Sequence, residues 1–132
     1  MVKNLLIPNN TNKIINQLAN KITHLPSPIH VIAVCSGGQI VGKKIYQYLK
    51  KKKINSSYNE AWTNIIGGKA TIWKSDFKKS NYVGTALIAE DVIWKGRSVN
   101  AVKKMLNKMK NKKSYIAVIL DCNHKADFSI FN

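Results

Sequence analysis

Apolar residues recur along the chain with two spacings, one typical of helices and one typical of buried strands. In residues 12–25 they recur every three or four positions: Ile14, Ile15, Leu18, Ile22 and Leu25. This spacing predicts a helix, which the segment Pro26-Ser27-Pro28 ends. Ile29–Cys35 is then apolar at every position except His30, which predicts a strand buried on both faces.

The same alternation continues to the end of the chain. The helical spacing returns in 41–49, before a run of lysines, and again in 99–109. Short apolar or mixed runs typical of strands occupy 58–66, 70–73, 85–89, 115–120 and 128–131. Gly67-Gly68 joins the first two of these into a predicted hairpin. Strands that alternate with helices indicate parallel crossover units, so we expect one α/β domain over residues 1–132, with a mostly parallel central sheet flanked by helices.

Composition narrows the class of protein. The 132 residues carry a net charge of +16, from 22 Lys and Arg against 6 Asp and Glu, and 45% are hydrophobic, which excludes a disordered basic tail. No apolar run approaches the roughly 18 residues that a membrane span requires. Cys35 and Cys122 lie far apart, and three scattered histidines complete no metal-ligand spacing. We therefore expect a small soluble protein of the cytoplasm, a reducing compartment, with no membrane partner.

The positive charge by itself suggests a phosphate backbone as partner. However, Arg97 is the one arginine in the chain, so the guanidinium fork that reads guanine edges is nearly absent. The abundance of Lys, Asn and Ile is expected of an AT-rich coding sequence. Scattered, solvated lysines are the simpler interpretation, and nucleic acid is a disfavoured partner.

Two predicted strand ends carry residues suited to ligand binding. Cys35-Ser36-Gly37-Gly38 precedes a helix, where paired glycines let an anion approach the backbone, although such a pair also occurs in plain turns. Glu90 and Asp91 follow a buried strand, and Lys95-Gly96-Arg97-Ser98 then precedes another helix. Carboxylates accept bonds from hydroxyls and helix amides hold phosphate, so a polyol phosphate would satisfy both halves. The alternative is an acidic pair that merely contacts nearby lysines.

Residues 87–98 resemble the PRPP-binding motif of the type I phosphoribosyltransferases. That motif has four apolar residues, two acidic ones, two apolar ones and a short glycine-containing loop ending in Ser or Thr. The Glu-Asp order is closest to the hypoxanthine-guanine branch. Residues 34–38 match the family's pyrophosphate loop by position, and 126–131 match an aromatic segment of the purine enzymes. The resemblance covers roughly residues 12–132 and implies the family's three-layer fold with a reduced hood over the base.

The resemblance implies how the chain would hold Mg²⁺ and PRPP. Glu90 and Asp91 would be the catalytic pair that contacts the ribose hydroxyls, directly or through Mg²⁺. The loop Trp94-Lys95-Gly96-Arg97-Ser98 would hold the 5′-phosphate. Ser36, Gly37 and Gly38 would face the pyrophosphate.

The resemblance also implies the reaction and the partners. Phe128 would stack on a nucleobase, with the backbone of Ser129 near the edge of that base. A purine-like base would displace pyrophosphate from the 5-phosphoribosyl group of PRPP, a reaction of purine salvage. Family members commonly form homodimers, so a homodimer is expected here.

The chain departs from the family's pattern in three respects. Trp94 and Lys95 stand where purine enzymes have Asp-Thr, whose Asp is proposed to handle the proton at N7 of the purine. Ser36 stands where a cation often precedes the glycines, and Asp121 lies in the stretch where a lysine recognises the purine's exocyclic oxygen. The sequence therefore leaves three hypotheses open: an enzyme with an unusual acceptor, a non-catalytic PRPP- or nucleotide-binding regulatory module, and a basic nucleic-acid-binding protein on this fold.

Overall fold

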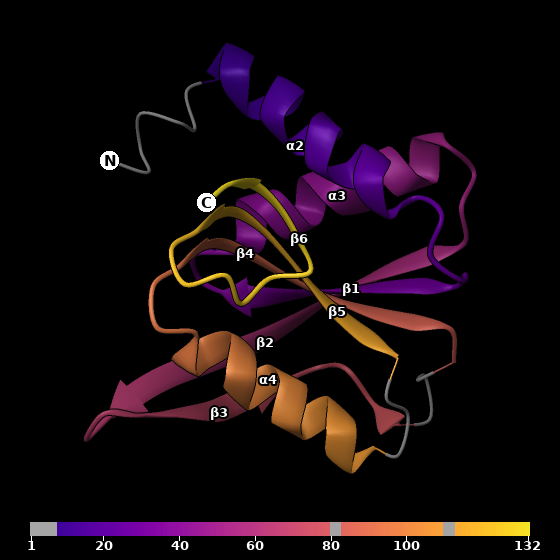
Figure 1. Ribbon diagram of the computed structural model, residues 1–132. Coiled ribbons are helices and arrows are strands. Elements are labelled where there is room, and N and C mark those ends of the chain that lie inside the picture. Colours follow the sequence, from indigo (N-terminus) through magenta and orange to yellow (C-terminus); the bar gives the residue numbers. More distant parts are fainter. Residues whose placement is uncertain (1–7, 80–82, 110–112) are drawn as a thin grey trace.

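A computed structural model describes residues 8–79, 83–109 and 113–132 of the chain (Figure 1). Three helices and six strands follow one another in these segments. In chain order they are α2 (Pro8–Ile22), β1 (Ile29–Cys35), α3 (Gln39–Lys51), β2 (Ser56–Ile66), β3 (Lys69–Ser75), β4 (Thr85–Ile93), α4 (Arg97–Lys108), β5 (Ser114–Asp121) and β6 (Phe128–Phe131).

The six strands form one sheet in the order β3-β2-β1-β4-β5-β6. Every neighbouring pair is parallel except the β2–β3 hairpin. Helices α2 and α3 pack together on one face of the sheet, and α4 covers the other face (Figure 1). The predicted fold class, a three-layer α/β arrangement with a mostly parallel central sheet, is confirmed.

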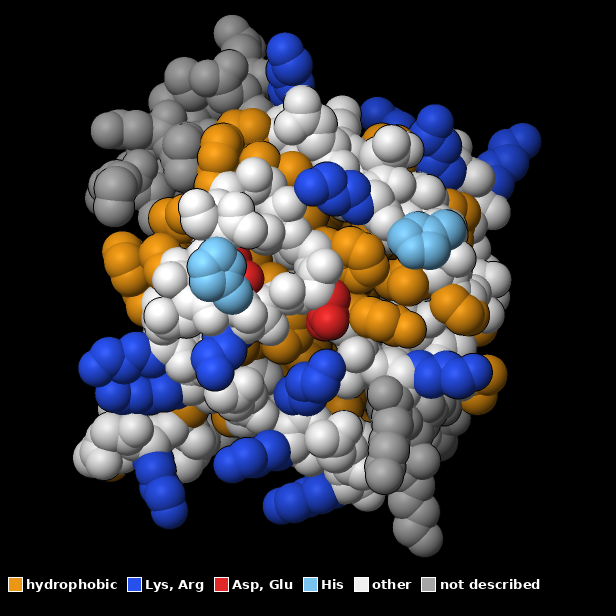
Figure 2. All heavy atoms as spheres, viewed as in Figure 1, with side chains coloured by type: hydrophobic (Ala, Val, Ile, Leu, Met, Phe, Trp, Pro, Cys, Tyr) orange, Lys and Arg blue, Asp and Glu red, His pale blue; other side chains and the backbone are white. Residues whose placement is uncertain are grey.

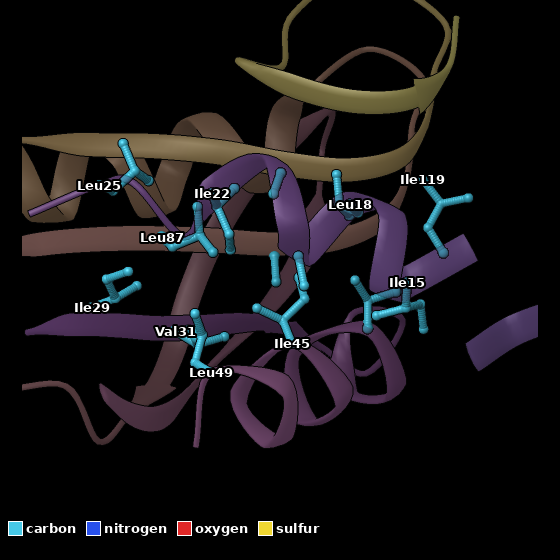
Figure 3. Close-up of a cluster of buried hydrophobic side chains, with 14 residues drawn as sticks. Ile15, Leu18, Ile22, Leu25, Ile29, Val31, Ile45, Leu49, Leu87 and Ile119 are labelled. Carbon is cyan, nitrogen blue, oxygen red and sulfur yellow. The ribbon is translucent and has the colours of Figure 1, made fainter. Parts of the chain in front are cut away.

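Two apolar cores hold the layers together. Between the sheet and the α2–α3 layer, Ile15, Leu18 and Ile22 pack against side chains of three strands and of α3 (Figure 3). On the other face, Val99, Val102 and Leu106 of α4 pack on the sheet. All seven residues of β1 are buried, which explains its continuous apolar run. The apolar side chains that recur at helical spacing in the sequence therefore pack against the sheet from both sides.

Two element boundaries differ from the prediction. Helix α2 ends at Ile22, and Leu25 stays buried in the connection to β1. Strand β4 continues past Ala89 to Ile93, because β5 is long enough to pair with its last residues. The acidic pair, Glu90 and Asp91, therefore lies within a strand instead of just after one.

No helix in the described part of the chain is both long enough and apolar enough to cross a bilayer.

Candidate functional site

The two predicted ligand-binding loops meet at the carboxyl end of the sheet. Strands β1 and β4 are parallel neighbours, so the residues that follow β1 lie beside the acidic pair. A Cβ atom built on Gly37 would lie 3.0 Å from Oδ1 of Asp91 and 3.0 Å from Oε1 of Glu90. The glycine loop, Ser36–Gly38, therefore crosses directly over both carboxylates.

The glycine loop is held closely against the sheet before α3 begins. A Cβ atom on Gly38 would lie 2.4 Å from the carbonyl oxygen of Ala89 and 2.8 Å from that of Val34. The Gly38 amide donates to this Val34 carbonyl at 2.7 Å, and the peptide bond between Cys35 and Ser36 is cis. Only glycine fits at position 38, which is buried against the sheet, whereas Ser36 and Gly37 before it are exposed.

The acidic pair is electrostatically unusual. Burial raises the pKa of Glu90 to about 9, and the neighbouring Asp91 carboxylate raises it further. The Asp91 amide donates to Glu90 Oε1 at 3.0 Å, and this bond partly opposes the rise. Asp91 Oδ1 accepts a bond from the Val92 amide at 2.8 Å. Glu90 is therefore protonated at neutral pH in the free protein, and a cation or a donor placed beside it would favour its charged form.

A pocket of about 300 Å³ opens beside the acidic pair. Its walls come from the end of β4, the start of α4 and the β2–β3 hairpin: Ile65, Glu90, Val92, Ile93, Trp94, Lys95, Gly96, Arg97, Ser98 and Val99. All five residues of the predicted phosphate loop, Trp94–Ser98, line it.

The start of α4 provides the anion-binding part of this pocket. Gly96 has a φ of +76°, which turns the chain into a helix that begins at Arg97. The first amides of a helix have no partner within it, and a glycine at the cap offers no side chain to bind them. Lys95 and Arg97 are exposed beside these amides. The arrangement suits a phosphate.

The β2–β3 hairpin contributes a wall that the sequence analysis missed. The Thr63 hydroxyl donates to the Ser98 hydroxyl at 3.2 Å, and Ile65 faces the pocket. No local pattern in the sequence distinguishes Thr63 or Ile65 from other hairpin residues. Their proximity to α4 follows from the long β2 strand.

Trp94 is the aromatic residue among those that line the pocket, and 57% of its surface is accessible. Its backbone carbonyl accepts a bond from the Asn123 side-chain amide in the turn after β5. The backbone at Trp94 is therefore held by the turn after β5, and the exposed indole ring is available to a planar ligand.

Asp121, which stands where the purine enzymes have a lysine, binds the protein's own backbone. Its two oxygens accept amide bonds from Lys125 at 3.0 Å, Ala126 at 2.9 Å and Asn123 at 3.4 Å. Burial alone would raise its pKa, but these three amides outweigh burial and hold the pKa below its ordinary value. Asp121 therefore shapes the β5–β6 turn and does not face the pocket as a base-recognition group.

The chemistry of the site fits a divalent cation only in part. Among the described residues, no three or more His, Cys, Asp and Glu side chains gather in a way that could hold a metal ion. Glu90 and Asp91 are nevertheless adjacent carboxylates beside a phosphate-sized pocket. Mg²⁺ is commonly bound by one or two carboxylates together with substrate phosphates, so the pair fits an ion that arrives with its substrate.

No family model matches the sequence, and no curated protein is significantly similar to it in sequence. Solved structures match the whole arrangement. A purine phosphoribosyltransferase from Pyrococcus horikoshii superposes with a TM-score of 0.79 at 20% identity, over 96% of this chain and 84% of that one. The chain has the fold of the purine phosphoribosyltransferases. Two further solved structures have the same fold. One is a hypoxanthine-guanine phosphoribosyltransferase from Bacillus anthracis, with a TM-score of 0.75 at 21% identity over 91% of this chain and 75% of that one. The other is a hypoxanthine phosphoribosyltransferase from Staphylococcus aureus, with a TM-score of 0.72 at 18% identity over 89% of this chain and 70% of that one.

The aromatic segment of this phosphoribosyltransferase fold is placed differently from the prediction. Phe128 pairs with Ala117, and its ring lies 6.1 Å from that of Tyr115 and 6.2 Å from that of His24, packed on the α2 side of the core. The Ser129 carbonyl accepts a bond from Lys21 of α2 at 2.9 Å. The structure therefore does not bring Phe128 and Ser129 to the pocket.

The other aromatic residue of this segment lies nearer the ligand-binding edge. Phe131 pairs with Leu120, close to the end of β5, and 39% of its surface is accessible. The sequence shows aromatic residues at both 128 and 131, and it does not show which of them reaches the carboxyl end of the sheet. That choice depends on the register of β6 against β5.

Glu60 is a further residue that the sequence analysis missed. Its carboxylate accepts bonds from Gln39 at 3.0 Å, Tyr58 at 2.7 Å and Trp62 at 3.3 Å, and the bonds from Gln39 and Tyr58 hold its pKa below the ordinary value against the effect of burial. Gln39 directly follows the glycine loop. The signal was present in the sequence, because Tyr58, Glu60 and Trp62 alternate on one face of a strand.

Proposed function

We propose that the protein is a Mg²⁺-dependent phosphoribosyltransferase that transfers the 5-phosphoribosyl group of PRPP to a purine-like nucleobase and releases pyrophosphate. The observation that carries this proposal is the position of Gly37 over Glu90 and Asp91, beside the pocket at the start of α4. Bare backbone, paired carboxylates and the first amides of α4 thus lie near one another at the carboxyl end of the sheet. PRPP carries the matching groups: a pyrophosphate, ribose hydroxyls and a 5′-phosphate.

Each part of the site has one task in this proposal. The α4 loop, Trp94–Ser98, binds the 5′-phosphate through the first amides of α4, with Lys95 and Arg97 as countercharges. Asp91 and Glu90 accept bonds from the ribose hydroxyls and hold the sugar below the glycine loop. Mg²⁺, when bound, would neutralise charge on the pyrophosphate as it leaves.

In this reaction the protein positions the two substrates and forms no covalent bond to them. A ring nitrogen of the base forms a bond to C1 of the ribose as the bond from C1 to the pyrophosphate oxygen breaks, and the proton on the base passes to solvent or pyrophosphate. The glycine loop orients the leaving group, and the α4 loop fixes the opposite end of the sugar phosphate. Holding both ends of the substrate aligns the reacting atoms.

Trp94 and Asp121 indicate how the acceptor would be recognised. Asp121 is committed to three backbone amides, so no side chain at this position meets an exocyclic oxygen of a base. Trp94 instead offers a flat apolar surface beside the pocket. The acceptor in this proposal is held mainly by stacking, with Phe131 as a second aromatic side chain on the same edge of the sheet. In line with the family resemblance, we expect the enzyme to act as a cytoplasmic homodimer.

One observation favours a second candidate function. No carboxylate occupies the Trp94 position, so the usual proton-handling group is missing while the PRPP-binding parts are present. A non-catalytic module that binds PRPP or a nucleotide for regulation would have the same pocket. Turnover with a base separates this candidate from the enzyme.

Calorimetric titration with Mg-PRPP tests the binding step. We expect one site per chain, and Asp91→Asn should weaken binding at least about tenfold, because a charge-assisted bond to a ribose hydroxyl is lost. Asp127→Asn is the matched control: it removes the same charge from an exposed residue whose Oδ2 accepts the Ile116 amide at 2.8 Å, a bond that an Asn oxygen can keep. Equal affinity of wild type and Asp91→Asn would contradict the assignment of the acidic pair.

A further inference from the structure

A second hollow lies between α2 and α3, on the outer surface of their layer. Its volume is about 460 Å³, and it is lined by polar and cationic side chains: Asn12, Asn16, Lys44, Gln47, Tyr48, Lys51 and Lys52. We call it the lysine groove. The α3 residues of this set recur at helical spacing from 44 to 51 and form one continuous face of that helix, and Lys52 caps its end.

The lysine groove is separate from the pocket that binds PRPP in the proposed function. Along α3, the groove residues Lys44 and Lys51 lie about 9 Å and about 20 Å from Gly38 at the start of the helix. The pocket at α4 lies on the opposite face of the sheet from α2 and α3. A ligand bound in the groove would therefore be distinct from PRPP in the pocket at α4.

Charge on the α2–α3 layer has one sign. No Asp or Glu occurs in the sequence before Glu60, so α2 and α3 contain lysines and no acid. The acids of the chain lie instead in and around the sheet, and Figure 2 shows Lys and Arg side chains spread over one face, with acidic side chains only near its centre. The sequence suggested scattered lysines; in the structure α2 and α3 form a surface without compensating charge.

Within the described part of the chain, the lysines of the groove have no carboxylate partner. Lys44 donates to Asn12 Oδ1 at 2.8 Å, and the Lys52 ammonium lies 5.5 Å from the centre of the Tyr48 ring. Lys44 and Lys51 are two turns apart on α3, about 10 Å along the axis. Like charges on one helix face repel each other, and a bound polyanion would relieve that repulsion.

We propose that the lysine groove binds single-stranded nucleic acid through its phosphate backbone. Lysines act as point charges for phosphates spaced along an extended chain, and the amides of Asn12, Asn16 and Gln47 can bond to base edges. Among the described large apolar residues that are exposed, Ile40 alone lies on α2 or α3, so this face lacks the apolar groups that a membrane surface would require. The scarcity of arginine, which disfavours reading of specific bases, is consistent with contact to the backbone.

The test is fluorescence anisotropy with a labelled oligouridine of about 20 nucleotides, titrated at several salt concentrations. The triple variant Lys44→Gln, Lys51→Gln, Lys52→Gln should bind at least about tenfold more weakly, and its salt slope should fall by about 2, because each phosphate contact to a single strand contributes about 0.7. The matched control, Lys78→Gln, Lys104→Gln, Lys108→Gln, removes the same charge from exposed positions outside the groove and should change affinity by less than about twofold.

Several outcomes would overturn the proposal. One is that the wild type does not bind the oligonucleotide near physiological salt, and another is that both triple variants lose affinity equally. A third is binding to duplex alone, and a fourth is displacement of the oligonucleotide by micromolar tripolyphosphate. The last would show a site for small anions. Thermal unfolding of each variant verifies that it is folded. Binding of Mg-PRPP should be unchanged in the groove variant, so failure of this proposal and failure of the proposed enzyme activity are separate results.

Discussion

Gly37 lies against Asp91 so closely that a Cβ atom at position 37 would be 3.0 Å from the Asp91 Oδ1 atom. The neighbouring glycine is packed differently. A Cβ atom on Gly38 would meet backbone, 2.4 Å from the Ala89 carbonyl oxygen. The two glycines of one short loop therefore serve different purposes, the first in the ligand site and the second in the fold.

This difference predicts opposite effects for two alanine substitutions. Gly37→Ala displaces carboxylate side chains that can move, so the protein should keep its thermal stability and bind Mg-PRPP more weakly. Gly38→Ala forces the backbone apart and should lower the free energy of unfolding by about 1–3 kcal/mol. Chemical denaturation and calorimetry measure the two effects. Equal stability loss in both variants would show that position 37 has no special relation to the acidic pair.

Glu90 predicts how stability depends on pH in the metal-free protein. Its carboxyl has a pKa of about 9 when folded and an ordinary value of 4.5, so between these values the folded state holds one proton more than the unfolded state. Stability should therefore fall as the pH rises from about 5 to about 9, and Glu90→Gln should flatten that dependence. Thermal melts in a chelating buffer measure this, and an unchanged slope in Glu90→Gln would contradict the buried, protonated carboxyl.

Substitution of Asp121 should lower the stability of the protein without weakening ligand binding. Asp121→Asn replaces one of the two acceptor oxygens with an NH₂ group facing backbone amides, so we expect about 2 kcal/mol of destabilisation by urea unfolding. Because the pKa of Asp121 is lowered in the folded state, its contribution is present above the ordinary pKa and is lost as the pH falls through the folded pKa. A stable variant with altered acceptor preference would instead give Asp121 a role in recognising the base.

Substitution of Trp94 should affect the two substrates differently. Trp94→Ala should leave the affinity for Mg-PRPP within about twofold and lower kcat/KM for the accepted base about tenfold or more, since base stacking on an aromatic ring contributes about 1–3 kcal/mol. Trp73 on β3 has the same exposure, 57%, and lies outside the residues that line the pocket, so Trp73→Ala is the control. The same loss in both variants would remove Trp94 from the acceptor site.

The order of helices and strands could be predicted because each is marked by its own apolar spacing. The approach of Ser36–Gly38 to Glu90–Asp91 also followed, since parallel neighbours bring their carboxyl ends together. Strand register was not available from the sequence. It determines that β4 runs on to Ile93, and that Phe131 and not Phe128 lies near the end of the sheet.

Contacts between distant segments were the other part that the sequence could not supply. Thr63 reaches Ser98 across 35 positions, and Asp121 turns back to the amides that follow it. A local pattern does not show such partners. Asp121 therefore stood out in the sequence for its difference from the family, whereas its role in the structure is to hold a turn.

Pyrophosphate release from Mg-PRPP in the presence of a panel of purine and related bases tests the proposed transferase most directly. We predict release that depends on one or a few of the bases, a stoichiometric nucleotide product, and loss of turnover in Asp91→Asn but not in Asp127→Asn. Tight binding of Mg-PRPP with no base-dependent pyrophosphate release would contradict the enzyme and favour the regulatory module.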